Sequence, residues 1–425
     1  MNRLTRVGPP PPVRAVHLGL GAFFRAHQAW YTDRADDGAD WGIAAFTGRR
    51  PDLADALTAQ DGLYTLVTRR ADGDEFGVVR SVARAHAADE HDAWLGYLAS
   101  PDVRVVTLSV TEAGYRPDAA PARLLAGLRA RRAADAGPLT LVPCDNLPEN
   151  GAVLATALRE LAEPALREWM DQAVSIATTM VDRITPQPTD ADRAAVLGGT
   201  GTDDRSPVVT EPFSEWVISG DFPGGRPAWE SAGAVLTDDV TPYEQRKLWL
   251  LNGGHSLLAY VGALRGHATV DQAVEDEHCR ALLEQWWSVC IPHLTVSRTE
   301  AEAYCVALLD RFANPRIGYA LAQIATDGSQ KLPVRIMPVL QRERAAGRLP
   351  ESAVVVLAAW IGHLRGSGAA VRDIRAAEFV DAAAGPLDTA VPRVLAALDP
   401  ALASDAELVA AVRRQAPQSS FSRAG

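Results

Sequence analysis

The sequence predicts an α/β fold over residues 1–240 and a largely helical fold over residues 241–425. Two observations support this prediction. Up to about residue 186, short apolar runs alternate with stretches of helical spacing, which is typical of a parallel sheet covered by helices on both faces. From about residue 240 onward, only helical spacing continues. We therefore predict two domains with these bounds.

The first domain contains candidate strands that are short, apolar and bounded by turn-forming residues. They lie at residues 13–21, 41–48, within 102–115, at 138–146 and at 174–186. Helical spacing is found at residues 22–37, 51–60, 121–134 and 151–170. The polar stretch 187–206 is rich in Gly, Thr and Asp and predicts a surface loop.

The composition is that of a globular protein, with 47% hydrophobic and 22% charged residues. The net charge of −11 repels phosphate backbones and anionic lipid, which argues against nucleic acid and membrane as partners. The first residues show no apolar signal core and no cleavage-like site, so we expect no signal peptide, and no later apolar run is long enough to span a membrane. The four cysteines form no CxxC pair, which argues against structural zinc and a disulfide scaffold. We expect a cytoplasmic, metal-independent protein, either a monomer or a small homo-oligomer.

A glycine turn follows the first predicted strand. In "HLGLGAFFRAH", Gly19 and Gly21 occupy the position where a Rossmann-like dinucleotide-binding fold needs them. Gly19 permits the tight turn, and Gly21 lets backbone N–H groups approach a pyrophosphate. The third glycine of the fingerprint is absent, so a plain glycine turn remains an alternative. We predict a cofactor site that includes Gly19, Gly21, Ala22 and Phe23.

The second predicted strand ends in Thr47-Gly48-Arg49-Arg50, without the acid that usually binds the adenosine ribose. Asp52 comes only slightly later. Arg49 at this position can accommodate a 2′-phosphate, although such an arginine is more often a solvated loop residue. NAD is therefore the predicted cofactor, and NADP is not excluded.

Lysine is rare in this chain. Of 42 Lys and Arg residues, only Lys247 and Lys331 are lysines. In a chain that favours arginine so strongly, a surface lysine can be replaced by arginine at little cost. Arginine cannot replace a lysine that must lose its proton. The two remaining lysines are therefore candidates for proton chemistry or ligand binding.

Lys247 lies in "YEQRKLWLLNGGHS" with two further polar residues. On an α-helix, Lys247, Asn252 and His255 would fall on one side, within an arc of about 140°. A partly desolvated lysine can accept the proton of a secondary alcohol, and an asparagine amide can donate to the developing alkoxide. The pair Gly253-Gly254 costs about 1 kcal/mol per residue in a helix, which predicts close approach of a ligand or cofactor.

Tyr243 offers a rival interpretation. Tyr243-x-x-x-Lys247 matches the tyrosine–lysine pair of short-chain dehydrogenases, in which tyrosine is the acid/base. The pattern is short and follows the predicted α/β domain, so we favour the lysine as the base.

The chain resembles the mannitol dehydrogenase family, the long-chain, zinc-independent polyol dehydrogenases. The resemblance rests on blocks that include "SVTEAGY", "CDNLPENG", "MVDRITP", "TEPFSEWVISGDFPGGRPAWESAGA", "PYEQRKLWLLNGGHSLLAYVG" and "DGSQKLP". It implies hydride transfer between a nicotinamide cofactor and a secondary alcohol or ketone, with catalysis between a Rossmann-like and a helical domain. It also implies Lys247 as general base, Asn146 and Asn252 as oxyanion donors, and His255 as a substrate ligand.

The resemblance implies substrate contacts from Asp182 and Arg183 of "MVDRITP" and from Lys331 of "DGSQKLP". The block "IATDGSQKLP" is most similar to mannonate/fructuronate oxidoreductases, so D-mannonate/D-fructuronate is the expected substrate pair. Mannitol/fructose or another alditol is the alternative. An NAD-binding protein without catalytic activity is the hypothesis from a different class.

Overall fold

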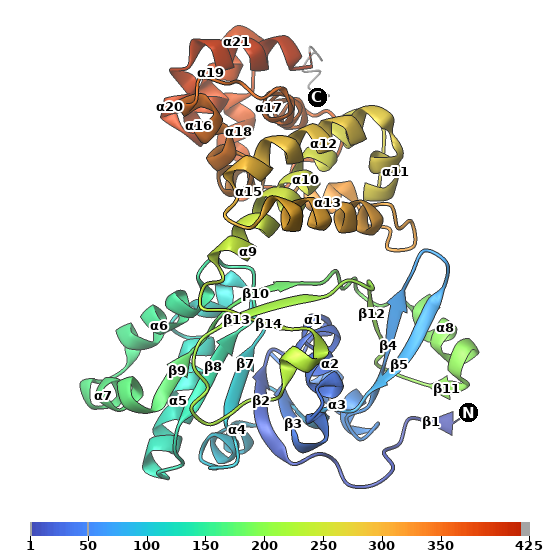
Figure 1. Cartoon of the computed structure of the whole chain (residues 1–425), viewed down its shortest axis with the longest axis vertical. Coiled ribbons are helices and arrows are strands. Elements are labelled where there is room, and N and C mark those ends of the chain that lie inside the picture. The colour runs from blue at the N-terminus through green and yellow to red at the C-terminus, as the bar shows by residue number, and fades with distance from the viewer. Residues whose placement is uncertain (1, 49–50, 418–425) are drawn as a thin grey trace. The chain divides into compact units, whose positions relative to one another are not determined.

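The computed structural model describes residues 2–48 and 51–417 (Figure 1). The chain divides into two compact units between Thr241 and Pro242. Each unit has its own architecture, and the two are described in turn.

The first unit is built on a six-stranded sheet in which every neighbouring pair is parallel. The strand order is β6-β3-β2-β7-β8-β9, which is the Rossmann order, with a switch point between β2 and β7. The strands are β2 (Val13–Leu18), β3 (Gly42–Phe46), β6 (Val82–His86), β7 (Val105–Leu108), β8 (Leu139–Pro143) and β9 (Val174–Ile176). The predicted Rossmann-like parallel sheet is confirmed.

Helices and further strands cover the two faces of this sheet. One face packs on α4–α7 through a core that includes Trp94, Leu128 and Leu158, and the other packs on α1–α3 through Phe24 and Leu57. The helices are α1 (Ala22–Ala26), α2 (Gln28–Arg34), α3 (Asp52–Thr58), α4 (His91–Leu98), α5 (Ala120–Ala133), α6 (Asn150–Leu161) and α7 (Pro164–Ala173).

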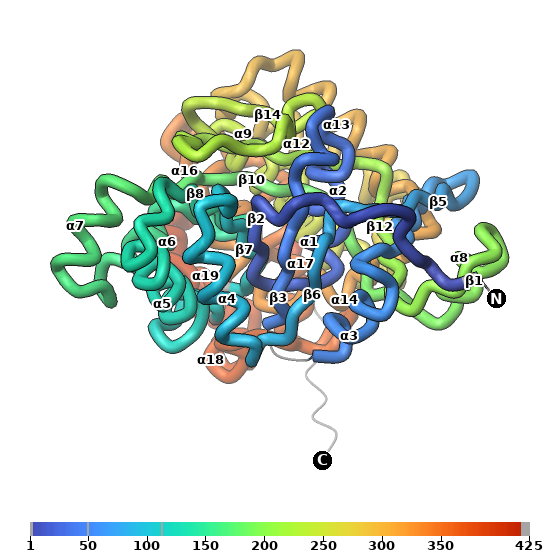
Figure 2. Tube along the Cα trace, turned by 90° about the horizontal axis from the view of Figure 1, so that it is seen from below, coloured from blue at the N-terminus to red at the C-terminus, as the bar shows by residue number. Residues whose placement is uncertain are grey.

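Three small sheets complete the first unit. Their strand orders are β10-β13-β14, β12-β4-β5 and β1-β11, and Figure 2 shows β1 beside α8. The elements are β1 (Asn2–Arg3), β4 (Tyr64–Arg69), β5 (Asp74–Val79), β10 (Thr178–Asp182), α8 (Asp190–Thr200), β11 (Thr202–Asp203), β12 (Val208–Thr210), β13 (Glu215–Ser219) and β14 (Val235–Leu236). Short 3-10 helices are η1 (Gly38–Asp40), η2 (Glu112–Tyr115) and η3 (Trp229–Ala232).

The structure corrects several local predictions. The predicted loop 187–206 contains α8, because Thr189 and Asp192 form a reciprocal capping box that starts a helix. The apolar run 174–186 forms two strands: β9 continues the main sheet, whereas β10 runs antiparallel to β13. The predicted helix 22–37 breaks at His27, and 151–170 breaks before Pro164, which cannot continue a helix. Strands β4, β5 and β6 were not predicted.

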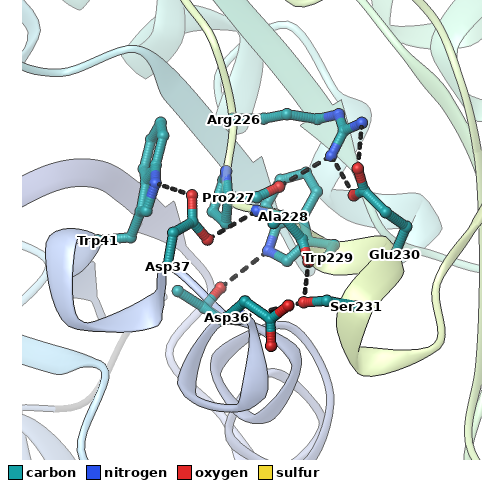
Figure 3. Close-up of polar contacts among 10 residues, drawn as sticks. Asp36, Asp37, Trp41, Arg226, Pro227, Ala228, Trp229, Glu230 and Ser231 are labelled. Atoms are coloured by element: carbon teal, nitrogen blue, oxygen red, sulfur yellow. Dashed lines mark hydrogen bonds and ion pairs between the residues drawn. The ribbon is translucent and has the colours of Figure 1, made fainter.

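A network around Asp37 joins the segment before β3 to the segment around η3 (Figure 3). The carboxylate of Asp37 accepts hydrogen bonds from Trp41 Nε1 at 2.9 Å and from the backbone N–H of Ala228 at 2.8 Å. Ser231 Oγ accepts from the backbone N–H of Asp36 at 2.9 Å and donates to the carbonyl of Ala228 at 2.6 Å. These bonds tie together segments that are far apart in the sequence.

Replacing Asp37 by alanine is expected to lower the free energy of unfolding by about 2–3 kcal/mol, because two N–H donors lose a charged acceptor. The measurement is urea unfolding of the full chain followed by tryptophan fluorescence. Asp36→Ala is the matched control, since Asp36 contributes its backbone N–H and its side chain is exposed. Equal stability of the two variants would contradict a role for the Asp37 carboxylate.

The second unit is helical, as predicted. Among its described residues no strand is formed, and one isolated bridge pairs Thr269 with Ala320. Its elements are α9 (Thr241–Arg246), η4 (Lys247–Asn252), α10 (Gly253–Leu257), η5 (Leu258–Gly262), α11 (Val270–Glu275), α12 (Glu277–Cys290), η6 (Ile291–His293), α13 (Arg298–Phe312), α14 (Leu321–Ile324), α15 (Gly328–Arg335), α16 (Met337–Ala345), α17 (Glu351–Leu364), α18 (Ala376–Ala382), α19 (Leu387–Leu398), α20 (Pro400–Ala403) and α21 (Ala406–Gln415). In the described ranges, no helix has both the length and the apolar character needed to cross a membrane.

Candidate active site

A cavity of about 920 Å³ lies in the first unit at the carboxyl ends of the parallel strands. Gly19 follows β2, Gly48 follows β3 and Ser109 follows β7, and all three line the cavity. Arg116 and Arg123, before and within α5, line it as well. In open α/β sheets, ligands bind outside the carboxyl ends of the strands at the switch point, which here lies between β2 and β7.

Gly19 adopts a conformation that only glycine takes easily. Its φ is +112°, and a Cβ placed on it would lie 2.3 Å from the carbonyl oxygen of Ser109. The backbone N–H groups of Gly19 and Leu20 both donate to the carbonyl of Phe46, at 3.0 and 2.8 Å. The chain therefore turns sharply at the end of β2 while it remains in contact with β3 and β7.

The other residues predicted for the cofactor lie around this turn. Gly21 caps the N-terminus of the short helix α1, while Ala22 and Phe23 are half-buried on it. The ring of Phe23 stacks on His27 at 4.9 Å. These three residues are not among those that line the cavity. Arg49 lies outside the described residues.

Asn146 and Asp182 follow or end strands of the first unit. Asn146 is exposed just after β8, in a turn where Asp145 accepts a hydrogen bond from the backbone N–H of Leu147 at 2.9 Å and another from the hydroxyl of Tyr115. Asp182 is the buried last residue of β10. The turn after β8 is thus fixed by the side chain that precedes Asn146.

Arg183 is buried among partners of the first unit. Its Nη1 donates to the carbonyl of Ala26 at 2.5 Å, and its Nε and Nη2 donate to the carbonyl of Glu211 at 3.4 and 3.3 Å. The guanidinium also lies 4.5 Å from the centre of the Trp30 ring. This arrangement favours a structural role for Arg183 over the predicted substrate contact.

In the second unit, Lys247 and Asn252 lie on a π-helix, η4, and not on the α-helix assumed from the sequence. A π-helix pairs residues five apart, so Lys247 and Asn252 lie one turn apart on the same side. The arc of about 140° that an α-helix predicts for this group is therefore too wide for these two residues, although they still share one side. His255, three residues later on α10, continues this side. Both Lys247 and Asn252 are half-buried, and His255 is buried.

Two tryptophans of α12 contact the carbonyls of the π-helix. Trp286 Nε1 donates to the carbonyl of Trp249 at 2.8 Å, and Trp287 Nε1 donates to that of Leu250 at 2.9 Å. A Cβ on Gly253 would lie 2.7 Å from Trp286 Nε1, and one on Gly254 would lie 2.8 Å from Leu283. The sequence predicted that a ligand approaches this glycine pair. In the structure, side chains of α12 approach it instead.

A polar group from α15 contacts the same helix. Arg335 Nη1 donates to Ser256 Oγ at 3.2 Å and to the carbonyl of Asn252 at 3.4 Å, and Ser256 Oγ donates to that carbonyl at 3.1 Å. The imidazole of His255 packs against Phe312 at 4.6 Å and meets Tyr319 edge-on at 5.5 Å. These contacts fix the backbone at Asn252 and the ring plane of His255.

Lys331 lies one turn before Arg335 on α15. Its Nζ donates to the carbonyl of Ile324 and to Thr326 Oγ1, both at 3.1 Å. Burial, and then the neighbouring charge of Arg335, lowers the pKa of Lys331 to about 8. Burial also lowers the pKa of Arg335 to about 10, so the guanidinium stays charged at neutral pH. Arg335 and Ser256 were missed from the sequence, because one more arginine or serine carries no signal in this chain.

The ring of Tyr243 packs against Arg246, which is not one of the predicted site residues. The guanidinium of Arg246 lies 5.2 Å from the centre of the Tyr243 ring and 4.3 Å from that of Tyr304. Arg246 also donates to Glu300 at 2.7 Å. A face of the Tyr243 ring is thus covered by Arg246, and Tyr243 stays the alternative to Lys247 as the acid/base.

Family models identify the chain. Residues 13–231 match the mannitol dehydrogenase Rossmann domain, and residues 239–418 match the mannitol dehydrogenase C-terminal domain. The chain belongs to the mannitol dehydrogenase family. It is therefore an oxidoreductase of the type that acts on secondary alcohols of polyols or sugar acids, and the resemblance found from its sequence motifs is confirmed.

Relatives within the mannitol dehydrogenase family differ in their substrates. D-arabinitol 4-dehydrogenase of Ralstonia nicotianae is 38% identical over 83% of this chain and 83% of its own length. D-mannonate oxidoreductase of Escherichia coli is 34% identical over 83% of this chain and 80% of its own. The structure of Pseudomonas fluorescens mannitol 2-dehydrogenase with NAD and D-mannitol is 35% identical, covers 95% of this chain and 91% of its own, and has a TM-score of 0.81.

The position of the cavity in the first unit matches the place where a Rossmann fold binds a nicotinamide dinucleotide. The turn at Gly19 brings β2 and β7 within contact distance at the switch point, where the Rossmann fold binds such cofactors. Arg123 and Thr47 also carry buried polar atoms that have no hydrogen-bond partner within the described ranges. An incoming polar ligand would supply those partners.

Proposed function

We propose that this protein interconverts D-mannonate and D-fructuronate with a nicotinamide dinucleotide and Lys247 as general acid/base. NAD is the form bound in the solved mannitol 2-dehydrogenase. The single observation that supports a sugar acid is the pair Lys331 and Arg335, two cations on one face of α15, of which Arg335 contacts the helix that carries Asn252. A carboxylate is the substrate group that such cations bind best.

The roles of the side chains follow from their chemistry. In the oxidation, Lys247 accepts the hydroxyl proton of the secondary alcohol, and in the reduction it returns that proton. The Asn252 amide donates to the oxygen on which negative charge develops, the task that the resemblance also implies for Asn146. His255 binds a neighbouring hydroxyl, and Asp182 supports the site. The dinucleotide, when bound, accepts or donates the hydride.

Alditol oxidation is the second candidate, because a D-arabinitol 4-dehydrogenase is 38% identical to this chain. The test is a panel of D-mannonate, D-mannitol, D-arabinitol and D-sorbitol for oxidation, with the matching ketones for reduction, each with NAD(H) and NADP(H). We expect D-mannonate and D-fructuronate to give the highest kcat/KM. Preference for an alditol would select the second candidate, and cofactor binding without turnover on any member would indicate a protein without catalytic activity.

Replacing Lys331 by methionine is expected to raise KM for D-mannonate by about 10- to 100-fold, because a charged hydrogen-bond donor is lost. KM for D-mannitol, which has no carboxylate, should change less than about threefold by the same argument. Lys331→Arg keeps the charge and is the matched control. An equal rise in KM for both substrates would show that Lys331 does not select the carboxylate.

A further inference from the structure

Arg123 lines the cavity of the first unit without an ion-pair partner among the described residues. Its guanidinium lies 4.9 Å from the centre of the Phe46 ring and 4.8 Å from that of Trp94. The backbone carbonyl of Arg123 accepts a hydrogen bond from Trp94 Nε1 at 2.9 Å, which fixes the Trp94 ring against the backbone of α5. Its Nε and Nη2 are buried and make no hydrogen bond within residues 2–48 and 51–417. Buried donors of this kind call for a ligand, an ion or water.

The other charges at the cavity do not neutralise Arg123. Among the described residues that line the cavity, the acidic one is Asp118, and its carboxylate lies 3.6 Å from Nε of Arg116. The carboxylate of Glu90, near the same end of the sheet, forms hydrogen bonds with His86 Nδ1 and with the backbone N–H of Ala87, both at 2.7 Å. Among the residues that the structure describes, the cavity wall therefore keeps an uncompensated positive charge at Arg123.

This charge lies at the end of the second strand of the Rossmann order. Phe46 is the last residue of β3, and Thr47 follows it with a buried hydroxyl that has no partner in the described chain. Gly48, next along, lines the cavity, and a Cβ on it would meet nothing within 4 Å. In this fold the adenosine ribose lies at that strand end, where an acid selects NAD and an arginine accommodates the 2′-phosphate of NADP.

We propose that Arg123 binds the 2′-phosphate of NADP(H), so that the first unit binds NADP(H) more tightly than NAD(H). This inference rests on the nicotinamide dinucleotide of the proposed function. Arg123 supplies the charge, and Gly48, which also lines the cavity, leaves the space. Arg123 lies on α5, remote in sequence from the arginines that directly follow β3.

The test is calorimetric binding of NADP+, NAD+, adenosine 2′,5′-bisphosphate and 5′-AMP to the full chain. We expect NADP+ to bind at least about tenfold more tightly than NAD+. Arg123→Gln should lower the affinity for NADP+ and adenosine 2′,5′-bisphosphate by about 10- to 100-fold. The affinities for NAD+ and 5′-AMP should stay within about threefold of those of the parent chain. Retained 5′-AMP binding also shows that the variant is folded. Arg116→Gln, at the same cavity but paired with Asp118, is the control and should keep the preference for NADP+.

Three results would overturn the inference alone. NAD+ binding as tightly as NADP+ would remove the 2′-phosphate preference. Equal weakening of all four nucleotides in Arg123→Gln would place the guanidinium on the adenine. Loss of the preference in Arg49→Gln but not in Arg123→Gln would assign it to the arginine after β3. Absence of binding by every nucleotide would instead overturn the proposed function, and the inference with it.

Discussion

Replacing Lys247 by alanine is expected to lower kcat for alcohol oxidation by about 10²- to 10⁴-fold, the range that a general base contributes. Lys247→Arg should lose nearly as much, because a guanidinium keeps its proton and cannot act as a base. Steady-state kinetics of both variants, beside calorimetric dinucleotide binding, is the measurement. Binding should stay within about threefold of the parent, since the predicted loss lies in proton transfer.

Tyr243→Phe is the matched control for this prediction. Its ring already lies against the guanidinium of Arg246, and the substitution removes the hydroxyl alone. We expect kcat within about threefold of the parent chain. A large loss in Tyr243→Phe combined with a mild loss in Lys247→Ala would reverse the assignment and make the tyrosine the acid/base.

Gly19→Ala is expected to lower the free energy of unfolding by about 3 kcal/mol or more and to weaken dinucleotide binding strongly. The added Cβ would lie 2.3 Å from the Ser109 carbonyl, in a residue whose φ of +112° already disfavours alanine. Either the backbone at Ser109 or the turn at Gly19 must shift, and both residues line the cavity. The measurements are urea unfolding and calorimetric binding of NAD+ and NADP+.

Gly201→Ala separates the cost of the positive φ from the cost of the steric contact. Gly201 also has a positive φ, +69°, but a Cβ there meets nothing within 4 Å. It should lose only the conformational contribution, about 1 kcal/mol. If Gly19→Ala were no more damaging than Gly201→Ala, the close contact between β2 and β7 would not be needed.

The sequence predicted those parts of the fold that leave a periodic signal. Strands β2, β3, β7 and β8 are apolar and buried, and the helical spacing after residue 240 is sustained over long stretches. Strand β10 escaped prediction as a separate element, because one apolar run continues from β9 into a strand of another sheet. Helix α8 escaped because its glycines and aspartates obscured the capping box at Thr189.

The sequence predicted the site residues that belong to rare residue types and missed those that belong to common types. Lysine and asparagine are scarce here, so Lys247 and Asn252 stood out, whereas Arg123 and Arg335 are two of many arginines. The π-helix was hidden because the residues from Lys247 to Asn252 look like an ordinary apolar helix, and the contacts of its carbonyls with the tryptophans of α12 leave no signal in the sequence. Trp286 and Leu283 of α12 explain the glycine pair, which the sequence assigned to a ligand.

Chemical rescue of Lys247→Ala tests the proposed mechanism most directly. Methylamine added to the variant supplies a free proton acceptor in the place of the missing side chain. We predict that alcohol oxidation by Lys247→Ala rises with methylamine concentration and saturates, while Lys247→Arg, which leaves no space for the amine, is not rescued. A rate that stays unchanged over the same methylamine range, in a variant that still binds dinucleotide, would contradict Lys247 as the base.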